Sequence, residues 1–331
     1  MNKYVLGIDQ STQGTKGLLF DEKGALLCRA DLPHKQYIDE RGWVEHDPEE
    51  IYANTLQVVK NLIEKAGIDK KEISVLGISN QRETALVWDK KTGKPVYNAV
   101  VWQCARGSEI CKKIAAEHEN AEELVRSHTG LQLSPYFSAA KIAWVLQNVP
   151  GAQEKADRGE LCCGTIDSWL VYKLTGGREF RTDYSNASRT QMFHIGELAW
   201  DSEVCGLFGI PVSCLAEVTD SDGEYGTTDF DGYLDAPIPI RGVLGDSHGA
   251  LFGQGCIETG MIKTTYGTGS SIMMNIGKKP VYSNRVVTSL AWKLDGEVNY
   301  VLEGNINTGS VRGRTVRYRS CLCGRYCSGN L

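Results

Sequence analysis

The sequence predicts an α/β protein whose strands form a mixed sheet, and three segments support this class. An apolar run over 4–8 ends at Asp9, and after a polar turn a second apolar run leads away, which is typical of two antiparallel strands. A helical pattern then precedes an apolar strand over 73–79. A later strand, over 240–245, again ends at an aspartate, Asp246. The two similar strand ends suggest that both aspartates face one cleft.

The elements nearest the N-terminus have clear local signals. Residues 21–24 read as a turn, and 25–31 as a third antiparallel strand. Asp47 is a good N-cap for a helix that begins at Pro48, because proline suits the first helical position. The apolar face of this helix runs to Gly67, where glycine is expected to end it.

The later elements follow from the same rules of periodicity and turn chemistry. In chain order we expect strands over 73–79, 85–89 and 98–102, helical structure over 106–147 interrupted at 131–137, a helix over 164–174 capped by Thr165, a polar loop over 182–189, short helices over 200–218, and the start of a helix at 250–253.

Composition narrows the classes of function. The 331 residues carry a formal net charge of -5, with acids and bases spread along most of the chain. This argues against a nucleic-acid surface and for a protein that handles small molecules. We find neither a signal segment nor an apolar run of membrane-spanning length, so we expect a cytoplasmic protein with no membrane partner. The eleven cysteines are mostly scattered singly, as reduced thiols would be.

The turn after Asp9 suits a phosphate. Backbone N–H groups of Thr12, Gln13 and Gly14 can point at an anion, and Lys16 adds a positive charge. Asp9, fixed at a strand end, could hold a hydrated Mg²⁺ beside that phosphate, since Mg²⁺ keeps several waters. The alternative is an ordinary β-hairpin with a polar turn.

A second glycine- and hydroxyl-rich turn over 263–271 follows the strand end at Asp246. Two such turns with two strand-end aspartates suggest phosphoryl transfer, in which one aspartate serves the metal and the other takes a proton from an attacking hydroxyl. The sequence contains no P-loop motif, no G-x-G-x-x-G that opens a βαβ unit and no protein-kinase catalytic loop.

The neighbouring Arg82 and Glu83 follow a strand end and could bind the hydroxyls of a polyol, because they offer donors and acceptors side by side. The alternative is a surface ion pair of little energetic value. Tyr136 precedes the helix expected over 138–147 and could equally be a core aromatic residue.

Several ordered motifs resemble one known family, the FGGY carbohydrate kinases, and the glycerol kinases within it. The motifs that carry the resemblance are Gly7-Ile8-Asp9-Gln10-Ser11-Thr12, Gly42-Trp43-Val44-Glu45-His46-Asp47-Pro48, Asn80-Gln81-Arg82-Glu83-Thr84, Val101-Trp102-Gln103-Cys104, Pro135-Tyr136-Phe137, Asp183-Tyr184-Ser185-Asn186-Ala187-Ser188-Arg189-Thr190 and Thr265-Tyr266-Gly267-Thr268-Gly269. The match runs from about residue 4 to about residue 305.

The resemblance implies an RNase H-like, actin/hexokinase-type fold and an enzyme that uses ATP and Mg²⁺ to phosphorylate a polyol hydroxyl, glycerol giving glycerol 3-phosphate. It implies Asp246 as the general base and Asp9 as the Mg²⁺ ligand through water. The other implied site residues are Arg82, Glu83, Trp102, Tyr136, Asp246 and Ser247 for the polyol, and Thr12, Gln13, Gly14, Lys16, Gly267 and Thr268 for the nucleotide phosphates. The resemblance also leaves room for a homo-oligomer, either a dimer or a tetramer.

Two departures from the family pattern concern substrate specificity, and a third concerns the phosphate turn. Ser247 follows the base aspartate where glutamine is usual, and Ser270 and Ser271 stand where an aromatic residue is usual. These smaller polar groups predict a roomier pocket, which could admit a longer polyol or a ketose such as xylulose. Lys16 stands where arginine is usual, which keeps the charge but loses the fork geometry.

The end of the chain departs from the family. We expect an N-terminal kinase domain over 1–252, the beginning of the second domain over 253–307, and an unrelated basic, cysteine-containing tail over 308–331. The tail could reflect a reading-frame shift near Asn307, a short form, or a segment that binds metal or nucleic acid. Because the adenine-binding half is missing from this pattern, a catalytically impaired polyol-binding fragment is the rival hypothesis.

Overall fold

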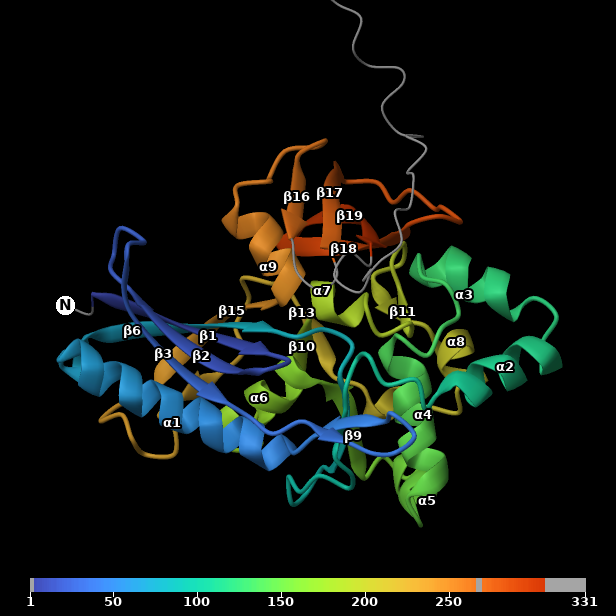
Figure 1. Ribbon diagram of the computed structural model, residues 1–331, viewed down its shortest axis with the longest axis horizontal. Helices are drawn as coiled ribbons and strands as arrows, with labels where there is room; N and C mark the ends of the chain where they lie inside the picture. Colours follow the sequence, from blue (N-terminus) through green and yellow to red (C-terminus); the bar gives the residue numbers. More distant parts are fainter. Residues whose placement is uncertain (1–2, 266–269, 307–331) are drawn as a thin grey trace, which may run out of the picture.

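The computed structural model describes residues 3–265 and 270–306. Its central sheet has six strands in the order β14-β15-β6-β1-β2-β3 (Figure 1). The strands are β1 (Tyr4–Ser11), β2 (Gly14–Phe20), β3 (Leu26–Pro33), β6 (Ile73–Asn80), β14 (Thr227–Thr228) and β15 (Ile238–Gly245). β2 is antiparallel to β1 and to β3, whereas β6 runs parallel to both β1 and β15. The mixed sheet predicted from the sequence is therefore confirmed.

Helix α1 (Pro48–Ala66) covers one face of this sheet and packs against β2 and β3. Its predicted caps are confirmed: the Asp47 side chain accepts a hydrogen bond from the Glu49 amide at 2.9 Å, and Gly67 adopts the left-handed conformation at φ 64°. Its buried residues join the sheet and α6 (Ile166–Leu174) in one apolar core. This core fixes the strand ends on which the site is built.

A second sheet of five strands extends this part of the molecule, in the order β4-β5-β8-β7-β9. Its strands are β4 (Tyr37–Ile38), β5 (Val44–His46), β7 (Ala85–Asp89), β8 (Ala99–Val100) and β9 (Leu161–Thr165). It shares a core with helices α2 (Ser108–Glu117), α3 (Ala121–Thr129), α4 (Ser138–Asn148), α5 (Ala152–Asp157) and α8 (Ser202–Leu207).

Two expectations need correction here. The helix expected from residue 164 begins at Ile166, because β9 pairs with β7 through Thr165. Thr165 is the N-cap of this helix, as predicted. Its backbone amide donates a hydrogen bond to Ser168 Oγ at 3.1 Å. The strand expected over 98–102 is only the short β8.

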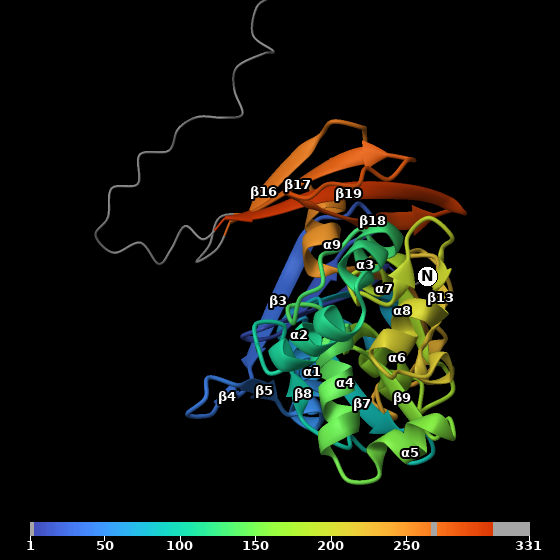
Figure 2. The same ribbon diagram turned by 90° about the vertical axis from the view of Figure 1, so that its right-hand side faces the viewer.

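The third sheet lies above the other two and has four strands in the order β16-β17-β19-β18 (Figure 2). Its strands are β16 (Ile262–Thr265), β17 (Ser270–Gly277), β18 (Val287–Leu294) and β19 (Glu297–Ile306). Helix α9 (Asp246–Gly253) leads into it and begins at Asp246, four residues earlier than expected. Trp292 and Val301 of the sheet share a small core with Leu251 of this helix.

The remaining elements are short: β10 (Arg181–Asp183), α7 (Tyr184–Ala187), β11 (Phe193–His194), β12 (Ala199–Trp200) and β13 (Glu217–Thr219), with 3-10 turns at Lys70–Glu72 and Val212–Cys214. The helix α7 forms within the segment expected to be a polar loop, because the Asp183 side chain caps it. None of the helices that the structure describes is long and apolar enough to cross a membrane. The domain boundaries expected at 252 and 307 stay predictions, and the segment 308–331 lies outside the described residues.

Candidate functional site

The site forms where β1, β6 and β15 end side by side. In the sheet Gln10 pairs with Asn80, and Asn80 pairs with Gly245. Because carboxyl ends of parallel strands meet at one edge of a sheet, Asp9 and Asp246 lie on either side of the end of β6. The two aspartate strand ends that the sequence singled out therefore belong to one edge.

Arg82 and Glu83 follow β6 directly at this edge, and both are buried, at 6% and 2% exposure. The alternative of a surface ion pair is therefore wrong. Glu83 has a positive φ of 60°, a conformation that a non-glycine residue adopts only at a cost. The Thr84 amide donates to the Arg82 carbonyl at 2.8 Å. This tight turn directs the two neighbouring side chains into the same interior space.

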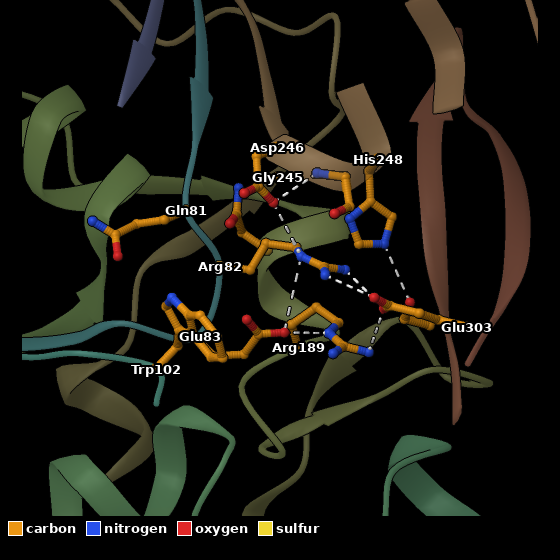
Figure 3. A network of polar contacts seen from close by, with 12 residues as sticks. Gln81, Arg82, Glu83, Trp102, Arg189, Gly245, Asp246, His248 and Glu303 are labelled. Carbon is orange, nitrogen blue, oxygen red and sulfur yellow. Dashed lines mark hydrogen bonds and ion pairs between the residues drawn. The ribbon is translucent and has the colours of Figure 1, made fainter. Parts of the chain in front are cut away.

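A network of four buried charges surrounds that space (Figure 3). Arg82 donates from both terminal nitrogens to Glu303, each at 2.9 Å. Arg189 donates from Nε to Glu83 at 2.6 Å, and its Nη1 lies 3.1 Å from Glu303. Two guanidinium groups and two carboxylates thus alternate, so that each buried charge has an opposite neighbour.

The network fixes the charge states of its members. Burial alone would raise the pKa of Glu303, but the charges of Arg82 and Arg189 outweigh it and hold that pKa well below the usual range. Burial alone would lower the pKa of Arg82, but the negative charges of Glu303 and Glu83 raise it well above the usual range. Burial and the charge of Arg82 lower the pKa of the neighbouring His248, so its ring stays neutral. Its Nε2 atom lies 3.2 Å from Ser289 Oγ.

Asp246 lies beside this network with one face open. Its Oδ1 atom is 3.3 Å from Nε of Arg82, and 41% of its side chain is exposed. Loss of solvent around the carboxyl raises the pKa of Asp246, while the positive charge of Arg82 lowers it by less. A carboxylate with an accessible face and a raised pKa is suited to accept a proton from a bound hydroxyl.

Gly245 and Ser247 flank this carboxylate in different ways. A Cβ atom on Gly245 would lie 2.7 Å from Cγ of Arg82, so a larger residue would displace the arginine. The Ser247 amide donates to Asp246 Oδ1 at 2.6 Å. Ser247 therefore contacts the expected base through its backbone, and a polyol contact of its hydroxyl stays a prediction.

The expected phosphate turn is the two-residue link between β1 and β2. Thr12 and Gln13 lie at its tip, because Ser11 and Gly14 already pair across the hairpin. A Cβ atom on Gly14 would lie 2.4 Å from the Leu32 carbonyl oxygen, so β3 leaves room only for glycine. The turn is thus both tight and fixed by its neighbouring strand.

Asp9 and Lys16 face each other at the base of this turn. Lys16 Nζ lies 2.7 Å from Asp9 Oδ2, and the two side chains are 32% and 26% exposed. Ser79 Oγ donates to the other oxygen of Asp9 at 3.3 Å. A partly exposed carboxylate with a hydroxyl neighbour fits a hydrated Mg²⁺ that is held through water, and Lys16 can turn to a phosphate from the same place.

Trp102 and Tyr136 form the aromatic part of the expected polyol site. Their rings meet edge to face with centroids 5.6 Å apart. The Trp102 indole donates to Thr12 Oγ1 at 3.0 Å, which joins the polyol side of the site to the phosphate turn. Burial raises the pKa of Tyr136, so its hydroxyl stays a hydrogen-bond donor. Gly267 and Thr268, which were expected to contact the nucleotide phosphates, lie outside the described residues.

Sequence reasoning assigned no role to Glu303, Arg189 or His248, although the structure places them among the site residues. Arg189 belongs to the Asp183–Thr190 motif and His248 follows the strand end at Asp246, but neither position indicates that the side chain lies near Arg82. Glu303 had a clearer signal: this acidic residue directly follows the apolar residues Tyr300, Val301 and Leu302 within strand β19. A charge in such a strand is buried only with a partner, and its partner is 221 positions away in the sequence.

Among the described residues, one further group could offer ligands to a metal ion. Atoms of His128, His194 and Asp201 lie within 4.8 Å of one another. However, His194 Nδ1 accepts hydrogen bonds from the amides of Gly196 and Glu197 at 3.2 Å and 3.0 Å. Its proton is therefore on Nε2, which leaves this histidine without a free ligand nitrogen. The cluster does not fit a metal centre.

Comparisons with known proteins show the family to which the chain belongs. The model of the FGGY family of carbohydrate kinases, N-terminal domain, matches residues 4–253. Glycerol kinase 1 of Thermotoga maritima is 54% identical over 306 residues, which cover 92% of this chain and 62% of the relative. A glycerol kinase of Carboxydothermus hydrogenoformans is 50% identical over 305 residues, covering 92% of this chain and 61% of the relative.

Solved structures show the same fold. The structure of Plasmodium falciparum glycerol kinase with ADP superposes with a TM-score of 0.85 at 38% identity, covering 92% of this chain and 61% of that one. A xylulose kinase from Lactobacillus acidophilus has a TM-score of 0.81 at 20% identity, covering 92% and 60%, and shows the fold alone. The expected RNase H-like, actin/hexokinase-type fold is confirmed, and the chain spans about three fifths of the length of these relatives.

Proposed function

Because the chain belongs to the FGGY family of carbohydrate kinases, we propose that its site serves the transfer of a phosphoryl group from ATP to a polyol hydroxyl. Glycerol is the proposed substrate and glycerol 3-phosphate the product. The observation that carries the proposal is the partly open Asp246 carboxylate, 3.3 Å from a buried arginine at the edge that also bears Asp9. Such an edge can hold an acceptor hydroxyl beside its base and next to a phosphate turn.

In this proposal the polyol lies between two kinds of surface. Arg82 and Glu83 offer a donor and an acceptor for neighbouring hydroxyls, while Trp102 and Tyr136 cover the carbon chain. Asp246 accepts the proton of the attacking hydroxyl, and Arg82 stabilises the carboxylate that does so. The Ser247 hydroxyl is proposed to contact a polyol longer than glycerol.

The nucleotide side is proposed to use the hairpin turn and the Asp9–Lys16 pair. Thr12, Gln13 and Gly14 supply backbone N–H groups to the phosphates, and Lys16 supplies a positive charge. Asp9 would hold Mg²⁺ through water, and the bound ion would neutralise charge on the transferred phosphoryl group. Gly267 and Thr268 are proposed to complete the phosphate contacts.

The proposed reaction suggests a cellular location and partners for the protein. Free polyol and ATP meet in the cytoplasm, and the net charge of -5 suits a protein without nucleic-acid partners. We therefore propose a cytoplasmic enzyme with small-molecule partners. Light scattering of the purified chain would distinguish a monomer from a dimer or tetramer.

A direct assay tests the proposed function. The 331-residue chain is mixed with ATP, Mg²⁺ and either glycerol, xylitol or xylulose, and ADP release is measured; glycerol binding is measured in parallel by calorimetry. Glycerol-dependent ADP release supports the proposal, and preference for xylulose assigns the ketose alternative suggested by Ser247 and Ser271. Binding without ADP release assigns the polyol-binding fragment, whereas the absence of both rejects the proposal.

A further inference from the structure

The Glu303 carboxylate is held by several contacts inside the protein. The residue is 1% exposed. Its two oxygens accept from both terminal nitrogens of Arg82 at 2.9 Å and from Ser271 Oγ at 3.0 Å, and Nη1 of Arg189 lies 3.1 Å away. Of the roughly four acceptor positions of a carboxylate, three take these hydrogen bonds, and Arg189 adds an ion pair. Glu303 therefore acts mainly on its protein neighbours.

The contact between Glu303 and Arg82 joins two different sheets. Arg82 follows β6 of the central sheet, whereas Glu303 lies on β19 of the four-stranded sheet, and their side chains meet (Figure 3). The bidentate geometry fixes the plane of the guanidinium group. With both terminal nitrogens held by Glu303, Nε of Arg82 lies 3.3 Å from Oδ1 of Asp246, as an ion pair without a hydrogen bond.

From this geometry we propose that Glu303 is a positioning residue for polyol binding: it orients the Arg82 guanidinium, and through it sets the charge balance at Asp246. The inference rests on the proposed function for its ligand. It makes the binding-competent orientation of Arg82 depend on where the four-stranded sheet lies relative to β6.

Charge counting gives this role a distinctive signature. Arg82 and Arg189 are balanced by Glu83 and Glu303, while the buried Lys263 and the partly open Asp246 add one group of each sign at the margin. Neutralising Glu303 leaves one buried positive charge in excess, which Asp246 must balance. The pKa of Asp246 should then fall, because its ionised form gains a freer guanidinium partner.

The test compares Glu303→Gln with Glu297→Gln. Glu297 lies on the same strand, but its side chain is 66% exposed and pairs with Lys278 at the surface. Glycerol affinity is measured by calorimetry on the 331-residue chain, and the Asp246 carboxyl is titrated by ¹³C NMR, with Asp246→Asn to assign the signal. We expect Glu303→Gln to weaken glycerol binding about tenfold and to lower the pKa of Asp246. Glu297→Gln should change neither.

Wild-type affinity together with an unchanged Asp246 titration in Glu303→Gln overturns the proposal. Should that variant not fold, Glu303→Asp keeps the charge but shortens the side chain and breaks the bidentate contact. A folded Glu303→Asp chain with unaltered glycerol affinity and Asp246 titration then counts equally against it. If the wild-type chain binds no glycerol, the proposed function fails, while the titration still tests the hold of Glu303 on Arg82.

Discussion

Arg82 contacts Glu303 and Asp246 through different nitrogens: its terminal pair is held at 2.9 Å by Glu303, and its Nε lies 3.3 Å from Asp246. One guanidinium thus links a fully buried carboxylate to a partly open one. The buried partner fixes the arginine, and the open partner remains available for chemistry. This division of roles separates residues that should affect the chemical step from those that should affect binding.

Asp246→Asn should remove the chemical step. The amide keeps the size of the side chain but cannot accept the hydroxyl proton, so we expect phosphorylation of glycerol to fall by about a hundredfold to ten-thousandfold. Glycerol affinity measured by calorimetry should stay within about threefold of the wild type. Asp235→Asn, at a surface carboxylate paired with Lys70, is the matched control. Equal ADP release from Asp246→Asn and the wild type would remove Asp246 from the role of base.

Lys16→Met should weaken the nucleotide side without altering the polyol side. The substitution removes a positive charge from the base of the phosphate turn and frees Asp9, from which Lys16 Nζ is 2.7 Å away. We expect the KM for ATP to rise about tenfold, with glycerol affinity unchanged. Lys23→Met, at an exposed turn beyond the same hairpin, should leave both quantities at wild-type values. A rise in the glycerol Kd alone would contradict this assignment of Lys16.

Gly14→Ala should destabilise the hairpin that carries the phosphate turn. The new Cβ would lie 2.4 Å from the Leu32 carbonyl oxygen, so β3 has to move away from β2. We expect a loss of about 1–3 kcal/mol in the free energy of unfolding, measured with urea. Gly206→Ala is the control, because nothing lies within 4 Å of its Cβ position in helix α8. That variant should be neutral or more stable by about 0.5–1 kcal/mol.

Local signals in the sequence account for most of the central fold. Asp47, Pro48 and Gly67 mark the ends of α1 because capping depends on residues within the same few positions. The two aspartate strand ends are visible for the same reason. The strand β9 was not predicted, because it forms by pairing with β7, which is distant in the sequence. The early start of α9 was not predicted either, because this helix begins directly where β15 ends.

The candidate site was predicted less completely, and the reason is again distance along the chain. Arg82 and Glu83 were singled out as neighbours, but their burial depends on Arg189 and Glu303. No local pattern connects these four residues, since the partners of Arg82 and Glu83 lie 221 and 106 positions away. The surface-ion-pair alternative was therefore wrong for a reason that only the folded chain reveals: the charges compensate one another inside the protein.

Lys141 should give the folded chain a pH-dependent stability. It is fully buried, and its ammonium donates to the backbone carbonyls of Pro135, Tyr136 and Phe137, with distances of 2.8 Å to the first and 3.0 Å to the last. It thereby holds the loop that carries Tyr136. Burial lowers the pKa of Lys141 from its ordinary 10.5 to about 7. Between these values the unfolded chain binds a proton that the folded chain does not.

The free energy of unfolding should therefore rise as the pH increases from about 7 to 10.5. The stability gained in this range is complete above pH 10.5 and is lost as the pH falls back to about 7. The expected slope is about 1 kcal/mol per pH unit, measured by urea unfolding at several pH values. Lys141→Met cannot titrate and should lack that slope, whereas Lys112→Met, at a side chain that is 72% exposed, should keep it. The same slope in Lys141→Met as in the wild type would show that another group causes the pH dependence.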